Sequence, residues 1–160
     1  MGVLSEEIKQ KIHDLFPRYP NKQAVTLPAL HMVHDTYRYV SQDAIREIAD
    51  LLDLSPSEVH DTMSFYNFFR EKEEKKLGRT RLWVCRGLAC MLRGGEELLA
   101  DLGKKLDTVP GSRSKDDKIS LEFAECIGAC EGAPCVLIND EYRLDITPDK
   151  QDALLAELRK

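Results

Sequence analysis

The chain has 160 residues and a net charge of −5, with 42% hydrophobic and 32% charged residues, which is the composition of a folded globular protein of one ordinary domain or two small ones. The mild negative charge argues against a nucleic-acid-binding surface, and no stretch approaches the roughly 18 consecutive apolar residues of a membrane span. We therefore expect no nucleic-acid partner and no direct insertion into a membrane. Five cysteines without a secretory signal favour a reducing, cytoplasmic compartment and metal binding over disulfides.

The beginning of the chain has the apolar spacing of helices. Residues 5–16 place their isoleucines, Leu15 and Phe16 on one helical face, and the prolines that follow should end that helix. A second helix is predicted over about residues 23–37, with Pro28 in or near its first turn.

Two further helices have clear start signals. Ser41 is a predicted N-cap, and Ser55 with Glu58 predicts a capping box in front of a fourth helix. The mixed-charge run 70–76 either extends that helix or forms a solvated linker. Residues 1–76 are thus predicted to form an N-terminal antiparallel helical bundle, with the domain boundary at the end of the charged run.

Strands and helices alternate after residue 76. The predicted strands are 79–85, 119–125, 135–138 and 142–146, and the predicted helices are 91–106 and one opening at 147–149. Residues 107–118, rich in charge, Gly and Pro, read as a loop. This order predicts an α/β domain over residues 77–160, with a right-handed first crossover.

Four cysteines form two closely spaced pairs in this second domain. Cys85 and Cys90 are separated by four residues and Cys126 and Cys130 by three, and each pair follows a predicted strand. Two strand ends can bring two short loops together at one edge of a sheet. Four thiolates meeting there would bind a soft metal ion or an iron–sulfur cluster.

Spacing alone leaves the nature of this site open. Structural zinc usually uses two Cys-x-x-Cys knuckles, a spacing that the chain lacks, and the plant-type ferredoxin pattern of a [2Fe–2S] cluster is also missing. Thioredoxin-like redox catalysis would need Cys-x-x-Cys as well. The glycines near the pairs would let backbone N–H groups reach the sulfurs in either kind of site; they are Gly87, Gly94, Gly128 and Gly132.

The residues around the cysteines resemble a known family. Residues 84–94 (VCRGLACMLRG) closely resemble the first cluster loop of thioredoxin-like [2Fe–2S] ferredoxins, and residues 125–134 (ECIGACEGAP) followed by Ile-Asn-Asp at 138–140 resemble their second loop. The helical half also fits through residues 54–60 and 64–66. The whole pattern is similar to that of the small NADH-dehydrogenase subunits of respiratory complex I, an NADH-quinone oxidoreductase.

The resemblance implies a helical bundle joined to a thioredoxin-like domain, with one [2Fe–2S] cluster bound by Cys85, Cys90, Cys126 and Cys130. It implies a partner flavoprotein subunit that holds FMN and NADH and exchanges single electrons with the cluster. Since the chain has no Gly-x-Gly-x-x-Gly motif, we expect a non-catalytic electron carrier within an oxidoreductase complex, cytoplasmic or peripheral at the inner membrane face through that complex. Related subunits serve NAD-dependent formate dehydrogenases and multi-subunit hydrogenases, and a zinc-stabilised structural adaptor is the alternative of another class.

The fifth cysteine, Cys135, departs from the family pattern, which has an ordinary apolar residue there. It is interpreted as a buried core thiol, or as a ligand that substitutes if Cys130 is lost. His31, His34 and His60 have no accompanying carboxylate or cysteine cluster, so solvated or interface positions are favoured over metal binding. The densest aromatic patch favours core packing, with an exposed part as an anchor for the flavoprotein; it consists of Phe65, Tyr66, Phe68 and Phe69.

Overall fold

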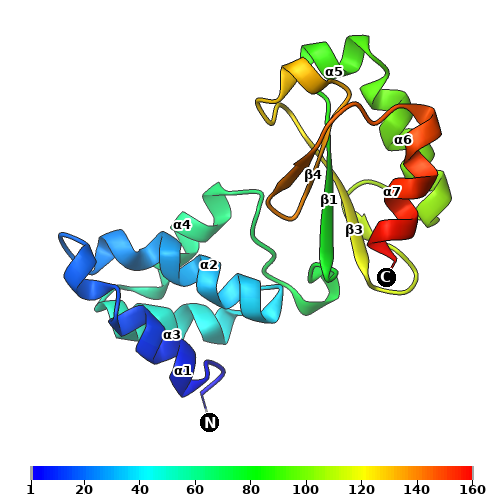
Figure 1. Cartoon of the computed structure of the whole chain (residues 1–160). Helices are drawn as coiled ribbons and strands as arrows, with labels where there is room; N and C mark the ends of the chain where they lie inside the picture. The colour runs from blue at the N-terminus through cyan, green and yellow to red at the C-terminus, as the bar shows by residue number, and fades with distance from the viewer. Residues whose placement is uncertain (1, 160) are drawn as a thin grey trace. The chain divides into compact units, whose positions relative to one another are not determined.

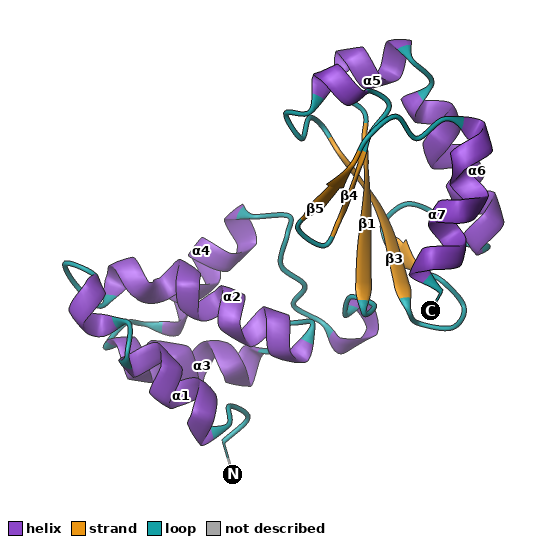
Figure 2. Cartoon of the chain, in the orientation of Figure 1, coloured by secondary structure: helices purple, strands orange, loops and turns teal. Residues whose placement is uncertain are grey.

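The structure, a computed structural model, describes residues 2–159 (Figure 1). The chain divides into two compact units, Met1–Lys76 and Leu77–Lys160, and each contains its own hydrophobic core. The first unit is helical, whereas the second contains a sheet flanked by helices (Figure 2). Among the described residues, no helix combines the length and the apolar character needed to cross a membrane.

The described residues of the first unit form four α-helices. They are α1 (Glu6–His13), α2 (Thr26–Tyr37), α3 (Gln42–Leu52) and α4 (Pro56–Phe65), with short 3-10 turns at Phe16–Arg18, Gln23–Val25 and Glu73–Lys75. The predicted start signals are confirmed, since Ser41 accepts a hydrogen bond from the backbone N–H of Ala44 and Ser55 forms a capping box with Glu58. The charged run after residue 70 does not extend α4, because that helix ends at Phe65.

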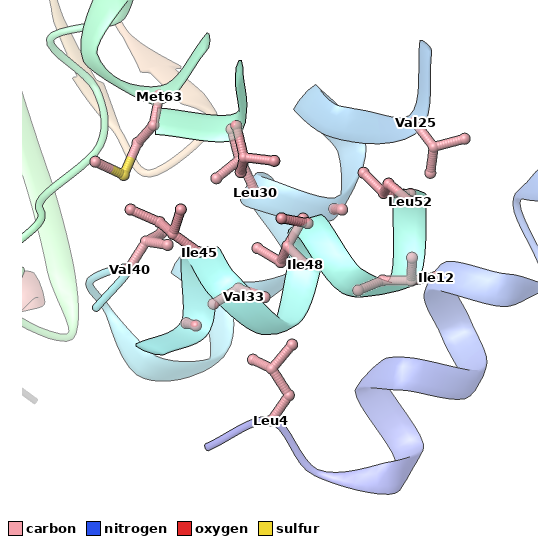
Figure 3. Close-up of a cluster of buried hydrophobic side chains, with 14 of the residues drawn as sticks. Leu4, Ile12, Val25, Leu30, Val33, Val40, Ile45, Ile48, Leu52 and Met63 are labelled. Carbon is pink, nitrogen blue, oxygen red and sulfur yellow. The ribbon is translucent and has the colours of Figure 1, made fainter. Parts of the chain in front are cut away.

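The core of the helical unit collects apolar side chains from all four helices. Figure 3 shows these side chains pointing toward one another, and the largest fully buried ones are Ile12, Leu30, Ile45, Ile48 and Leu52. Full burial of one such side chain is worth roughly 1.5–3 kcal/mol relative to exposure. Burial of these apolar side chains, which recur at helical spacing in the sequence, therefore stabilises the unit.

The second unit is built on a five-stranded sheet with strand order β2-β3-β1-β4-β5. The strands are β1 (Thr80–Cys85), β2 (Ser112–Arg113), β3 (Ile119–Ala124), β4 (Val136–Ile138) and β5 (Glu141–Arg143). Strands β1 and β3 are parallel and the other neighbouring pairs are antiparallel. The helices are α5 (Leu88–Leu92), α6 (Gly95–Leu106) and α7 (Gln151–Leu158).

Helices α6 and α7 pack against the sheet and lie side by side (Figure 2). Leu102 of α6 and Leu155 of α7 share one core cluster with the strand residues Leu82 and Leu121. The two helices are also joined by a 3.0 Å hydrogen bond from Lys105 Nζ to Gln151 Oε1. This core fixes β1 and β3, the two strands that precede the cysteine pairs.

Two sequence predictions about this unit were wrong. The helix expected over residues 91–106 is two helices, α5 and α6, because Gly94 adopts a left-handed conformation with φ of 87° and breaks the helix between them. The loop expected over residues 107–118 contains β2, which pairs with β3 through Arg113 and Ser120. A two-residue strand has too little alternation to show in the sequence.

Candidate metal centre

Both cysteine pairs lie at the same edge of the sheet. Strands β1 and β3 run parallel with Cys85 opposite Ala124, so their carboxyl ends coincide. Cys85 ends β1 and Cys90 lies in α5, just beyond that end of the sheet (Figure 1). Cys126 follows β3, and Cys130 begins a 3-10 turn. The convergence that the two predicted strand ends suggested is therefore present.

The two cysteine loops touch at Gly87. A Cβ atom at this position would lie 3.0 Å from the carbonyl oxygen of Glu125 and 3.4 Å from Cys126 Sγ. The neighbouring Arg86 N–H donates a 2.9 Å hydrogen bond to the carbonyl of Ala124. Glycine suits this contact, because a Cβ atom would require the second loop to give by a few tenths of an ångström.

The first pair is buried together with the fifth cysteine. Cys85, Cys90 and Cys135 have their sulfur atoms within 4.8 Å of one another, and the Sγ atoms of Cys90 and Cys135 are 3.5 Å apart. The expectation that Cys135 is a buried thiol is confirmed, since its exposed fraction is 0%. The sulfurs grouped with that of Cys135 are those of Cys85 and Cys90, whereas the interpretation of Cys135 as a substitute ligand concerned Cys130.

The second pair is exposed. Cys126 and Cys130 both reach the surface, and the proximity of Cys126 raises the pKa of the Cys130 thiol, with burial as a smaller cause. Cys85 contributes to the same rise. Within residues 2–159, the candidate metal-binding group contains Cys85 and Cys90 of the four predicted ligands but neither Cys126 nor Cys130, so the four-cysteine ligand set stays a prediction.

Backbone amides from both loops point at the sulfur of Cys85. Burial raises the pKa of this thiol, but hydrogen bonds from the N–H groups of Gly87 and Ile127 and from the neighbouring thiols outweigh burial, so the pKa of Cys85 is lowered. Burial keeps the pKa of Cys90 raised. Amide donors to a sulfur stabilise its thiolate form, which is the form that binds metal.

The glycines that the sequence singled out have different tasks. Gly87 contributes a backbone hydrogen bond to the sulfur of Cys85. Gly94 and Gly128 adopt left-handed backbone conformations, and Gly132 passes so close to Leu144 that a Cβ would lie 2.5 Å from that side chain. The donor Ile127 was missed, because every residue type except proline carries a backbone N–H and no sequence pattern marks the one that points at a sulfur.

The donor set fits a cluster of iron and sulfide. It offers four thiols in two pairs, with backbone amide donors at the sulfur of Cys85. The contact between the loops is made by Gly87, which has no side chain. Two thiolates per iron is the ligand count of a [2Fe–2S] cluster, although four thiolates also satisfy a tetrahedral zinc ion. Geometry alone still admits both, as the spacing did.

The histidines lie among aromatic rings or beside a carboxylate. His31 and His34 pack against the rings of Phe68 and Phe69 at centroid distances of 5.0–5.4 Å. His60 faces Glu71 at 3.6 Å. Within residues 2–159, no candidate metal-binding group contains a histidine.

The aromatic patch divides between core and surface, as the two interpretations together suggested. Phe69 is buried in the core of the helical unit, and Phe68 packs partly buried against it. Phe65 is 80% exposed and Tyr66 is 42% exposed, and their rings contact each other edge to face at 5.1 Å. The exposed part is therefore the end of α4 and the residue that follows it.

The fold and the site together define a thiolate-ligated metal protein on a thioredoxin-like α/β unit. Residues 12–159 match the family model described as thioredoxin-like [2Fe-2S] ferredoxin, and the chain belongs to this family. The predicted family and the predicted thioredoxin-like fold are thus confirmed.

Named relatives cover nearly the whole chain. NADH-quinone oxidoreductase subunit 2 of Thermus thermophilus is 34% identical over 162 residues, which span 99% of this chain and 87% of the relative. An NADH-quinone oxidoreductase subunit of Rickettsia bellii is 32% identical and spans 91% and 87%, respectively. Among solved structures, an air-oxidised NAD+-reducing [NiFe]-hydrogenase matches with a TM-score of 0.69 and 24% identity, covering 81% of this chain and 22% of that chain. This last likeness concerns the fold.

Proposed function

We propose that this chain is the [2Fe–2S] electron-transfer subunit of an NADH dehydrogenase module of the NADH-quinone oxidoreductase type. The observation that carries the proposal is the convergence of two cysteine loops at the carboxyl ends of β1 and β3, in a chain of the thioredoxin-like [2Fe–2S] ferredoxin family. The relatives named NADH-quinone oxidoreductase subunits support the choice of complex.

Four cysteines would hold the cluster, Cys85 and Cys90 on the buried side and Cys126 and Cys130 on the exposed side. When bound, the cluster supplies a centre that accepts and returns single electrons. The amides of Gly87 and Ile127 stabilise negative charge on the Cys85 sulfur, which favours the reduced state. The exposed pair leaves sulfur atoms at the surface, where a redox group of a partner can approach.

The partner in this proposal is a flavoprotein subunit that carries FMN and the NADH site. The chain has no glycine-rich dinucleotide motif, so hydride chemistry is assigned to that partner and the chain itself has no catalytic residue. Leu88 and Leu92 of α5 are 68% and 76% exposed, and Phe123 before the second loop is 43% exposed. Apolar side chains gathered around a redox site are what a partner subunit would cover. The five thiols favour the cytoplasm as the compartment.

The equivalent subunit of a formate dehydrogenase or hydrogenase would share all these features, and the subunits that co-purify from the native source distinguish these complexes. A zinc-stabilised adaptor is distinguished by metal content.

The experiment is anaerobic purification followed by analysis of iron, sulfide and zinc and by a visible spectrum. We expect two iron atoms and two sulfide ions per chain and the charge-transfer bands of a reddish-brown protein. A colourless protein with one zinc ion would overturn the proposal.

Two variants test the ligand assignment in the same assay. Cys126→Ser should lose the bands, whereas Cys135→Ser should keep them. Equal loss from both would show that the ligands are wrongly assigned.

A further inference from the structure

Three of the five thiols form a set that differs from the proposed cluster ligands. Cys135 immediately precedes β4, and its carbonyl accepts a 3.1 Å hydrogen bond from the N–H of Cys85 at the end of β1. The pairing of β1 with β4 therefore fixes Cys135 beside the first pair. We call Cys85, Cys90 and Cys135 the buried thiol trio.

The spacing of the trio suits one metal ion. A metal–thiolate bond of about 2.3 Å places three sulfurs around a single ion at roughly 4 Å from one another. In the trio all sulfur–sulfur separations are within 4.8 Å, and that between Cys90 and Cys135 is 3.5 Å. Side-chain adjustments of less than about 1 Å would therefore complete a three-coordinate site.

The surroundings of the trio select a soft ion. All three side chains are at most 2% exposed, and the small apolar residues Ala129 and Ala133 share their cluster. Within residues 2–159, no histidine or carboxylate joins the set. Structural zinc takes four ligands, and calcium and magnesium take oxygen, whereas thiolate-only sites suit Cu(I).

Backbone donors stabilise negative charge at two of the three sulfurs, while burial keeps the pKa values of Cys90 and Cys135 raised. The N–H groups of Gly87 and Ile127 donate to the sulfur of Cys85, and the N–H of Cys135 donates to the sulfur of Cys90. The trio is thus a buried set of soft donors with part of its hydrogen bonding already in place.

We propose that the buried thiol trio of the cluster-free chain binds one soft monovalent metal ion such as Cu(I). Binding releases thiol protons to solvent and changes no oxidation state. Since Cys85 and Cys90 belong to both sets, the ion and the cluster exclude each other, and the ion would block cluster assembly. Cys126 and Cys130 take no part. Cys135 thus acts with the first pair, and not as a substitute for Cys130.

The test uses the full chain freed of cluster by chelation, held without oxygen in a non-thiol reductant. The probe is Cu(I) supplied as its coloured bicinchoninate complex, and the readout is the withdrawal of copper from that complex. We expect one ion per chain for the unaltered protein and binding at least about tenfold weaker for Cys135→Ser, which keeps the size of the side chain.

Matched controls come from the exposed pair. Cys126→Ser and Cys130→Ser each remove one thiol of the same chain, and both should keep the affinity of the unaltered protein. Far-ultraviolet circular dichroism of each cluster-free variant verifies its fold, and Cys135→Ala provides a second substitution of the same thiol. The proposal is overturned if Cys135→Ser binds Cu(I) as well as the unaltered chain. It is equally overturned if the exposed-pair variants lose binding to the same extent, because the four-cysteine set would then be the site.

Discussion

The two units begin their helices in different ways. In the helical unit, three of the four described α-helices, α1, α3 and α4, start at serines whose side chains accept backbone N–H hydrogen bonds, and α2 has no side-chain cap. In the α/β unit, α5 and α6 start at Gly87 and Gly94, and neither has a side-chain cap. Caps stabilise a helix by about 1 kcal/mol, so the second unit forgoes a local gain that the first unit uses.

At the start of α5 the reason is a close approach beside the thiols, and at the start of α6 it is the left-handed φ of 87° at Gly94, followed by a close approach at Gly95. A Cβ at Gly87 would meet the second cysteine loop, and a Cβ at Gly95 would lie 2.9 Å from the carbonyl oxygen of Cys90 and 3.0 Å from that of Cys85. Larger residues here would displace the backbone that carries the ligands. Serine caps thus stabilise helices of the helical unit, whereas glycines at the edge of the α/β unit allow the cysteine loops to approach each other closely.

The largest effect is expected from the core of the helical unit. Ile48 is fully buried, so Ile48→Ala should lower the free energy of unfolding of that unit by about 2–5 kcal/mol. Because the site lies in the other unit with its own core, the visible spectrum per folded chain should not change. Urea unfolding followed by circular dichroism and by visible absorption measures both. Loss of the visible absorption bands while the chain is still folded would show that the site depends on the core of the helical unit.

A smaller loss of stability, but a larger loss of cluster, is expected from a change at the contact between the cysteine loops. Gly87→Val should cost about 1–3 kcal/mol of local strain and should reduce the iron and sulfide content of the purified protein. Gly87→Ala, with one methyl group, is the graded control and should retain more cluster than the valine variant. Full occupancy in both variants would show that the loops do not need their close contact.

The capping box gives an effect of about 1 kcal/mol. Ser55→Ala removes the side-chain acceptor for the N–H of Glu58 and should lower stability by that amount. Ser55→Thr keeps the hydroxyl and should recover most of the loss. Thermal unfolding monitored at a helix wavelength measures the change; equal stability of all three proteins would mean that the cap contributes nothing.

The smallest effect is expected at Glu47, whose carboxylate accepts hydrogen bonds from the N–H groups of Val3 and Leu4 and lies 3.5 Å from Lys9. Burial raises the pKa of Glu47, but these amide donors outweigh burial and lower it below its usual value of 4.5. A lowered folded-state pKa stabilises the fold above the unfolded pKa, and this stabilisation is lost as the pH falls through the folded pKa.

Glu47→Gln should therefore cost roughly 0.5–1 kcal/mol at neutral pH and close to nothing in acid below the folded pKa. Urea midpoints of both proteins across the acid range measure the difference. A cost that does not depend on pH would contradict the electrostatic explanation.

Local signals in the sequence were sufficient for much of the fold. The caps at Ser41 and Ser55 and the runs of β1, β3 and β4 could be predicted, because a cap or an apolar run depends on residues close in sequence, whereas the strand predicted over residues 142–146 is the shorter β5 at Glu141–Arg143. The break at Gly94 could not be predicted, since a glycine in a helical pattern can weaken a helix without ending it. The cis bond between Ala133 and Pro134 could not be predicted either.

The meeting of the two cysteine loops at one edge of the sheet could be predicted, because each cysteine pair follows a strand run that is visible in the sequence. The place of Cys135 beside Cys90 could not be predicted, since it depends on the pairing of β1 with β4. The exposure of Phe65 at the end of α4 could not be predicted either, because an aromatic residue in a helix of this unit fits a core position as well as a surface one.

The most direct test of the central claim is electron paramagnetic resonance of the anaerobically purified chain, recorded before and after reduction by dithionite. The account predicts no signal from the oxidised chain and, after reduction, one unpaired electron per chain with the spectrum of a reduced [2Fe–2S] centre. The Cys126→Ser variant should not give that spectrum. A chain that stays silent after dithionite while it retains its full metal content would contradict the account, because a redox-inert metal would then occupy the site.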